Sequence, residues 1–501
     1  MSLSDRTPLL EGHSQENSNE VEEEEDPVTL ATGEYDAQLE KRLVRKYDLM
    51  LLPFLSLMYL FSSLDRSSLG NAVLDNFEED VGITPDQFNT SITIFYVGFL
   101  LFQIPSNIML KKFTARRWLP LLMIAWGTMA CLHATINGFA SLVILRFLLG
   151  VFESGFFPGV IFFLTLFYKK NEIATRIALF WGSTVAAHAY AGILAYGILR
   201  LRGAQSMAGW QWLFLIEGIP TVLVAIIAWF YLPSSPETWS RLTLEEQRLA
   251  VSRLAIEDGG QHHHHVSLRD LDDASNREQA IKALVDWKVW LWMVMFFSGS
   301  VANTSISNFL PLIVKGMGYN DKLSANLMSS PPYLGAVIVM IGMAYSSDKF
   351  QERTYHAIAG ATFCLIGYVI LTTLTARSAL YAGICIVVAG VHTINPIMNA
   401  WLTSNIAPEM KRSVAAAMAV SANNSAGLLG SNIYRQSDAP RYLFGHTISL
   451  VFLCVFIVLA LIQRWLLLRV NQIKTIKIKQ NEPNQEGTLV GDEALDFMYR
   501  V

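Results

Sequence analysis

The segment Arg146–Gly159, which reads RFLLGVFESGFFPG, places two ionisable side chains inside an apolar run. Arg146, Gly150 and Glu153 are spaced i, i+4 and i+7, so they share one face of a helix. A charge at the centre of a bilayer costs at least about 2.5–3.5 kcal/mol and is tolerated where it faces a protein interior or a water-filled path. An arginine there can bind a carboxylate, and a glutamate can carry a proton. The alternative is a purely structural pair between Arg146 and Glu153.

Asp65 and Arg66 are a second pair of charges, deep in the apolar run 49–74. The planar guanidinium of Arg66 suits a two-point bond with a carboxylate, so we expect Arg66 and Arg146 to bind an anion. A structural pair between Arg66 and Asp65 is the alternative. Glu153, with Asp65 second, is the candidate for proton coupling. An anion that competes for the arginine near Glu153 would promote its protonation, so anion and proton would each favour binding of the other.

Three further polar side chains in apolar runs are candidates for contacts with a substrate. His188 lies among small residues, and histidine titrates near neutral pH, although packing is an alternative role. Asn395 shares a helical face with His392 and Asn399, and Asn424 lies in the next apolar run. These amides are expected to bond a polar substrate. The alternative is interhelical hydrogen bonding, worth about 0.6 kcal/mol each.

The composition indicates the kind of protein that holds these residues. The chain has 501 residues, of which 52% are hydrophobic and 16% charged, against about 25% charged in soluble domains. The charges crowd both ends and one central segment, which is typical of a protein that crosses the membrane several times. No basic domain suggests nucleic-acid binding. The four cysteines have neither disulfide nor zinc spacing, and the run His262–His265 is low-complexity sequence, so no metal or cofactor is expected.

Twelve apolar runs offer the roughly 20 residues that a membrane-spanning helix needs. This predicts an all-α membrane protein with 12 transmembrane helices in two six-helix halves, 47–232 and 288–468. Residues 1–46 are expected to be a disordered acidic cytosolic tail, 233–287 a central cytosolic loop and 469–501 a cytosolic tail. The predicted spans are 49–74, 88–110, 118–135, 139–167, 177–199, 212–232, 289–314, 325–346, 358–374, 380–401, 414–434 and 443–468.

Basic residues orient the predicted spans. Four of them precede the first span and four follow the second, at Lys111, Lys112, Arg116 and Arg117. Because positive residues mark cytoplasmic loops, both termini are expected in the cytosol. In the central loop, Thr243 followed three residues later by glutamate predicts the capped start of an amphipathic surface helix.

Two blocks of six spans around a long loop are the layout of a two-halved transporter. Five segments resemble the fungal allantoate permease group, which belongs to the anion:cation symporters of the major facilitator superfamily. The resemblance covers about residues 46–468 and implies the major facilitator fold and proton-coupled import of a small organic anion. Members carry nicotinate, pantothenate, biotin, allantoate or small peptides. The five segments are LDRSSLGNA, RFLLGVFESGFFPG, GWQWLFLIEGIPT, LPSSPETWSRLTLEEQRLAVSRL and NIYRQSDAPRY.

The sequence departs from the superfamily pattern after the second span, where Leu110 stands about where a gating aspartate is usual. Asp348 with Arg353 keeps part of that pattern in the second half, so we expect the gating charges there. The expected partners are a small carboxylate, protons and the bilayer, for a monomer in the plasma membrane or, alternatively, an internal membrane.

Two other classes of protein were considered. A nutrient sensor built on a transporter body would need a long ordered extension, whereas these tails are short and low in complexity. A membrane enzyme would need a catalytic cluster. His265 and Asp270 match a His-x4-Asp acyltransferase pattern, but they have no pocket motif beside them, and no phosphate-binding loop supports ATP-driven transport. We therefore expect a transporter and no enzyme.

Overall fold

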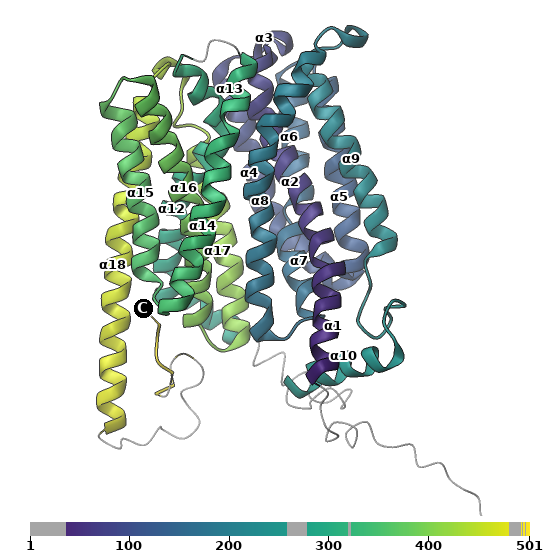
Figure 1. Cartoon of the computed structure of the whole chain (residues 1–501), viewed down its shortest axis with the longest axis vertical. Coiled ribbons are helices and arrows are strands. Elements are labelled where there is room, and N and C mark those ends of the chain that lie inside the picture. The colour runs from purple at the N-terminus through teal and green to yellow at the C-terminus, as the bar shows by residue number, and fades with distance from the viewer. Residues whose placement is uncertain are drawn as a thin grey trace, which may run out of the picture.

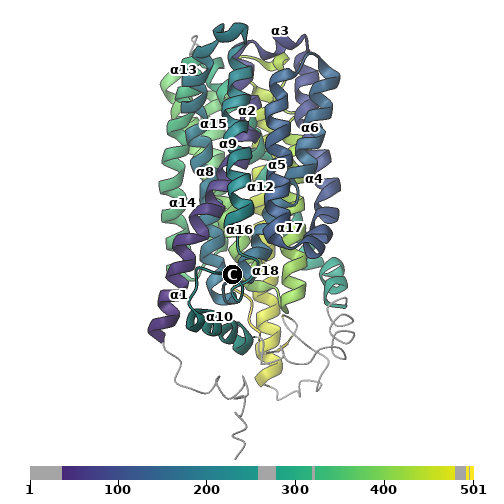
Figure 2. The same ribbon diagram turned by 90° about the vertical axis from the view of Figure 1, so that its right-hand side faces the viewer.

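The computed structural model describes residues 37–257, 278–318 and 322–479, together with 492, 494, 495 and 497–500. Within these ranges every regular element is a helix, and the long helices form an upright bundle (Figures 1 and 2). One end of the bundle, the α3 end, carries the short helices α3 (Phe77–Val81) and α13 (Lys322–Met328). The opposite α10 end carries α10 (Leu244–Glu257), the start of α1 and the end of α18. Residues 1–36 of the predicted tail, the run His262–His265 and the Asp270 motif lie outside the described residues. Residues 37–46, which were predicted to belong to the disordered tail, are helical and belong to α1 (Ala37–Met50).

Each of the twelve predicted spans overlaps a long helix. The corresponding helices are α1 with α2 (Ala37–Met50, Leu52–Ala72), α4 (Pro85–Phe113), α5 (Ala115–Leu132), α6 with α7 (Phe139–Glu153, Phe156–Thr165), α8 (Lys170–Ile198), α9 (Gly209–Tyr231), α12 (Trp287–Gly316), α14 (Ser330–Phe350), α15 (Thr354–Thr373), α16 (Arg377–Asn405), α17 (Glu409–Gly430) and α18 (Leu443–Lys479).

Eleven helical stretches in the described ranges are long and apolar enough to cross a membrane. The twelfth, α17, has 22 residues but carries the polar run SANNS, which lowers its hydropathy. It packs against α12 and α4 inside the bundle rather than standing apart. Polar residues within a membrane span are tolerated where they face the protein interior.

The helices pack chiefly within two sets, α2–α9 and α12–α18, and the sets meet where α8 contacts α13 and α14, and where α4 contacts α17. At the α3 end the sets are bonded together. The Asn89 side chain donates to the Tyr434 carbonyl at 3.4 Å, and the Thr93 and Ser431 hydroxyls are 2.7 Å apart. A Cβ added to Gly70 on α2 would lie 2.5 Å from the backbone oxygen of Asn308 on α12. The α3 end is therefore closed by direct contact.

At the α10 end, the predicted surface helix is present and docked. The Glu246 amide donates to the Thr243 hydroxyl at 3.2 Å and the Thr243 amide donates to the Glu246 carboxylate at 2.9 Å, which confirms the capping box. Glu246 also forms an ion pair with Lys46 on α1 at 2.6 Å. This pair fastens the helix of the central loop to the first helix of the chain.

The C-terminal residues beyond the last predicted span make ordered contacts. Helix α18 continues eleven residues past the predicted end at Leu468, to Lys479, and the described residues 492–500, here called the C-terminal strap, fold back onto the α10 end. Asp492 is only 1% exposed and accepts hydrogen bonds from Lys288 at 2.9 Å and Lys411 at 2.8 Å. Asp286 forms an ion pair with Lys411 at 2.7 Å. The negative charges of the two acids therefore neutralise the positive charges of the two lysines.

Candidate functional site

An ion pair between α2 and α6 stands at the centre of the bundle. The Arg66 Nη2 donates to Glu153 Oε1 at 2.6 Å, and the Ser62 hydroxyl, one turn earlier on α2, donates to the same oxygen at 2.5 Å. The Glu153 side chain is 3% exposed and that of Arg66 is 29% exposed. The acid therefore lies behind its cation, and the cation remains reachable from the cavity described below.

The local sequence explains how Glu153 reaches α2. It is the last residue of α6, and Ser154 and Gly155 separate α6 from α7. An added Cβ at Gly150 would collide with the Phe95 carbonyl on α4, and one at Gly155 would collide with the Ser106 hydroxyl. These glycines allow α6 to approach α4 closely, which brings the end of α6 beside α2.

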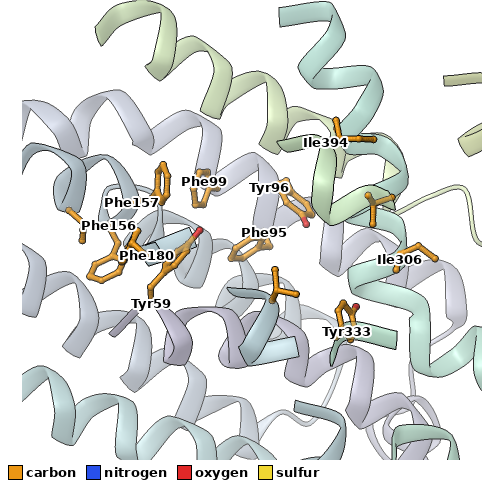
Figure 3. Packing of buried hydrophobic residues seen from close by; sticks show 14 of the residues in the cluster. Tyr59, Phe95, Tyr96, Phe99, Phe156, Phe157, Phe180, Ile306, Tyr333 and Ile394 are labelled. Carbon is orange, nitrogen blue, oxygen red and sulfur yellow. The ribbon is translucent and has the colours of Figure 1, made fainter. Parts of the chain in front are cut away.

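The exposed side of Arg66 lines a central cavity between the two sets of helices, with roughly 1050 Å³ of space that includes its solvent-open part. The first set contributes mostly aromatic rings, among them Tyr59, Phe156 and Phe157. Figure 3 shows these three rings grouped with the buried ring of Phe180. The second set contributes amides. The cavity-lining residues include Tyr59, Ser62, Arg66, Tyr96, Phe99, Glu153, Phe156, Phe157, Trp181, Thr184, His188, Asn303, Ser307, Asn308, His392, Asn399, Asn423 and Asn424.

Arg146 does not line this cavity. Its side chain is 2% exposed and lines a smaller neighbouring void together with Arg66, Tyr96 and Asn308. Glu153 pairs with Arg66, so the structural Arg146–Glu153 pair considered from their shared helix face is not observed. In the described part of the chain, the Nε and Nη2 of Arg146 have no hydrogen-bond partner.

Asp65 points away from the cavity and does not pair with Arg66. Its Oδ2 accepts a hydrogen bond from Thr221 on α9 at 3.0 Å, and its side chain is 4% exposed. Nearby on the same interface, the Ser68 hydroxyl donates to the buried carboxylate of Glu217. The alternative of a structural Asp65–Arg66 pair was therefore wrong, because consecutive residues on a helix point about 100° apart.

His188 lines the cavity at a place where the two sets of helices meet. Its Nδ1 bonds the Thr184 carbonyl at 2.7 Å, and its ring stacks on Tyr333 with centroids 5.1 Å apart. The ring of His392, from the second set, is 6.1 Å from that of His188 and 5.4 Å from that of Tyr333. A rearrangement of the two sets would separate these rings.

The remaining predicted residues divide between the cavity wall and its surroundings. Asn424 lines the cavity and donates to the Val420 carbonyl at 2.8 Å. Asn395 is 4% exposed and is not among the lining residues, although Asn399 on the same helix is. Arg353 pairs with the exposed Asp348 at 2.6 Å across the turn between α14 and α15, within one set of helices.

Sequence reasoning missed the polar partner of the central acid and most of the aromatic wall. Ser62 lies one helical turn before Arg66, so the i, i+4 spacing on the same face would have indicated it. Tyr59 and Tyr96 gave no comparable indication, because aromatic residues are common throughout membrane spans.

Comparison with known proteins identifies the family to which this chain belongs. The family model described as Major Facilitator Superfamily matches residues 55–431. The MFS-type transporter efuF of Hormonema carpetanum is 34% identical over 429 residues, which are 85% of each chain. The major facilitator-type transporter hxnP of Emericella nidulans is 33% identical over 427 residues, 84% of each chain. These relatives are transporters and not enzymes.

Solved structures of low sequence identity show the same fold. The xylose transporter XylE from E. coli, in a partially occluded inward-open conformation, has a TM-score of 0.64 at 14% identity and covers 89% of this chain and all of its own. A bacterial homologue of the human lysosomal transporter Spinster, inward-facing and occupied, has a TM-score of 0.63 at 13% identity, covering 83% of this chain and 97% of its own. This chain is a membrane transporter of the major facilitator superfamily, with that superfamily's twelve-helix fold.

Proposed function

We propose that this transporter is a proton-coupled symporter that imports a small organic anion, a vitamin-like carboxylate such as nicotinate or pantothenate. The observation behind the proposal is the Arg66–Glu153 ion pair on the wall of the central cavity. The five segments that resemble the fungal allantoate permease group favour the same class. Allantoate, biotin, a dipeptide or another organic acid is the alternative substrate.

The ion pair provides a physical route for coupling. Arg66 has one carboxylate partner among the described residues, and its exposed part faces the cavity. A substrate carboxylate that bonds Arg66 competes with Glu153 for the same cation. A buried glutamate that loses its cation is costly as an anion, so protonation becomes favourable. By linkage, proton binding at Glu153 then favours anion binding at Arg66 by the same factor.

The proposal assigns a different role to each of the other predicted residues. His188 and Asn424 line the cavity and are assigned to substrate contact, while Arg146 adds positive potential beside Arg66. Asn395 is assigned to the support of the cavity wall behind Asn399. Asp65 is assigned as a second proton-binding group, because its Oδ1 has no hydrogen-bond partner in the described part of the chain.

The proposed mechanism is alternating access, and the structure is assigned to an inward-facing state. The exposed Arg116 and Arg117 lie in the first turn of α5, at the same end as α10, so the positive-inside rule assigns that end and both termini to the cytosol. The closed α3 end then faces outward. The inward-open and inward-facing conformations of the two solved relatives support this assignment.

The gating role is assigned to Asp348 and Arg353 on the cytosolic side, where their pair would change partners as the halves rock. Plasma-membrane location and action as a monomer belong to the same proposal.

The test is uptake of labelled acids into transport-deficient fungal cells that express the protein. The panel contains nicotinate, pantothenate, biotin, allantoate and a dipeptide, at acidic and neutral pH, with and without a protonophore. Accumulation of one acid that collapses with the protonophore is expected. Arg66→Lys is expected to raise the substrate KM, whereas the surface variant Arg117→Lys leaves uptake unchanged. Uptake that ignores the proton gradient would contradict symport.

A further inference from the structure

Two buried acids at the contact between α2 and α9 have no cation bonded to them. Asp65 on α2 is 4% exposed and Glu217 on α9 is 3% exposed. Among the described residues, neither forms an ion pair with a lysine, arginine or histidine, and the Oδ1 of Asp65 and the Oε1 of Glu217 have no hydrogen-bond partner. A carboxylate with so few partners is strongly disfavoured inside a membrane protein.

The two acids contact hydroxyl groups in a reciprocal pattern. The Oε2 of Glu217 contacts the Ser68 hydroxyl of α2, which also lies 2.8 Å from the Leu64 carbonyl oxygen. The Oδ2 of Asp65 lies 3.0 Å from the Thr221 hydroxyl of α9, which also lies 2.9 Å from the Glu217 carbonyl oxygen. Each acid therefore contacts a hydroxyl on the opposite helix, and each hydroxyl has a backbone carbonyl as its second neighbour.

The number of hydrogens decides which of these groups donate. A hydroxyl has one hydrogen to donate. If Glu217 were ionised, Ser68 could satisfy either its carboxylate or the Leu64 carbonyl, and a full negative charge would have one neutral donor. If Glu217 is protonated, it donates to Ser68 and Ser68 donates to Leu64, so both contacts are hydrogen bonds. The same count applies to Asp65, Thr221 and the carbonyl of Glu217.

The contacts flank the arginine that lines the cavity. Asp65 and Ser68 lie on either side of Arg66 in one turn of α2, and at about 100° per residue their shared face is turned away from the Arg66 side chain. They bond α2 to α9, while Arg66 bonds Glu153 on α6 at 2.6 Å. All three helices belong to the first set, so a rearrangement of the two sets would leave these contacts in place.

We propose that Glu217 is a positioning residue that acts as a neutral carboxylic acid. With Asp65, Ser68 and Thr221 it forms an acid–hydroxyl clasp, which fixes the rotation of α2 and so the position of Arg66. Because the clasp lies within one set of helices, Glu217 keeps its proton throughout the transport cycle and takes no part in proton coupling. The clasp and the neutral acid stand without the proposed function, whereas the exclusion of Glu217 from coupling rests on it.

The first test makes the same substitution at two buried acids and uses the labelled acid that the uptake panel identifies. Glu217→Gln stays neutral and can still donate to Ser68, so it should keep the wild-type KM, pH profile and accumulation, in contrast to Glu153→Gln. Glu217→Ala removes the bond to Ser68 and should raise KM about 3- to 10-fold, as the loss of one hydrogen bond allows. Ser68→Ala breaks the same contact and serves if the Glu217→Ala variant does not fold.

Two outcomes of the uptake test would overturn the proposal. Loss of proton-driven accumulation in Glu217→Gln would show that Glu217 exchanges a proton. A wild-type KM in both alanine variants would show that the clasp does not position Arg66.

The second test needs no transport. Infrared spectra of the purified full chain at neutral pH separate the carbonyl stretch of a protonated carboxyl group, which shifts in heavy water, from the bands of a carboxylate. The difference between wild type and Glu217→Gln should show the loss of a protonated-carboxyl band. Loss of a carboxylate band instead would disprove the neutral acid. Because this readout needs neither substrate nor a proton gradient, failure of the clasp and failure of symport are distinguishable.

Discussion

Closure of the α3 end depends on a glycine in α8, and a single methyl group there should open it. A Cβ added to Gly192 would lie 2.6 Å from the Ser330 hydroxyl and 2.8 Å from the Ser329 hydroxyl, and closer still to the backbone carbonyl of Asn326. Ordinary Cβ contacts begin at 3.4 Å, so the shortfall at Ser330 is 0.8 Å (3.4 − 2.6). The serine side chains can rotate, but the backbone carbonyl cannot. Gly192→Ala therefore penalises the closed state.

The penalty can be converted into a shift of population. Overpacking by a methyl group costs about 1–3 kcal/mol, and each 1.4 kcal/mol is tenfold, so the state open at the α3 end should gain about 5- to 150-fold over the closed state. Gly197→Ala on the same helix is the matched control, because an added Cβ there meets nothing within 4 Å. Both variants share the gain in helix propensity from glycine to alanine, which cancels in the comparison.

Opening can be measured with a cysteine in place of Asn89, which is 6% exposed and bonds the Tyr434 carbonyl across the closed end. The background lacks the four native cysteines, and the reagent is a membrane-impermeant maleimide applied to intact cells. Gly192→Ala should speed labelling within the stated range, whereas Gly197→Ala should match the parent. Equal labelling rates in the two variants would refute the role of Gly192 in closure.

Two further predictions concern the α10 end. Asp492→Ala leaves Lys288 and Lys411 with Asp286 as their remaining acid. The variant should therefore lower the free energy of unfolding by about 3–5 kcal/mol, and the thermal midpoint with it. An unchanged midpoint would show that the C-terminal strap adds no stability. Partial burial acts to raise the pKa of the Glu246 carboxyl, but the hydrogen bond and charge of Lys46 and the hydrogen bonds from Thr243 together outweigh it and lower that pKa below the usual 4.5. A group with a lowered folded pKa stabilises at neutral pH and loses this contribution as pH falls through 4.5 and below. The rate of proteolysis within α10 should therefore increase on acidification. The increase should be small, because a surface ion pair contributes only about 0.2–1 kcal/mol. Glu246→Gln should remove this dependence on pH.

The sequence was sufficient to predict the helices, but the partner of each charged residue depended on how the helices pack. The i, i+7 spacing placed Arg146 and Glu153 on one face correctly. Yet Glu153 ends α6, and the glycines of that region bring it to Arg66 on α2 instead. Spacing along one helix contains no information on which neighbouring helix comes closest.

In helix α16, residues that were predicted to share one face differ in whether they reach the cavity. At about 100° per residue, Asn399 lies about 20° from His392 around the helix, whereas Asn395 lies about 60° away. His392 and Asn399 line the cavity and Asn395 does not. The contacts of the C-terminal strap were not predicted, because its composition is polar and the contacts are hydrogen bonds to Lys474, Asn405 and Lys411.

The central claim is that Glu153 exchanges a proton when a substrate anion takes its arginine. The most direct test is Glu153→Gln, which keeps the shape and the hydrogen bond from Ser62 but removes the charge, assayed with the acid that the uptake panel identifies. The account predicts that the variant still exchanges labelled for unlabelled substrate across the membrane but no longer accumulates it in response to a proton gradient. Accumulation by Glu153→Gln that matches wild type and collapses with a protonophore would contradict the account.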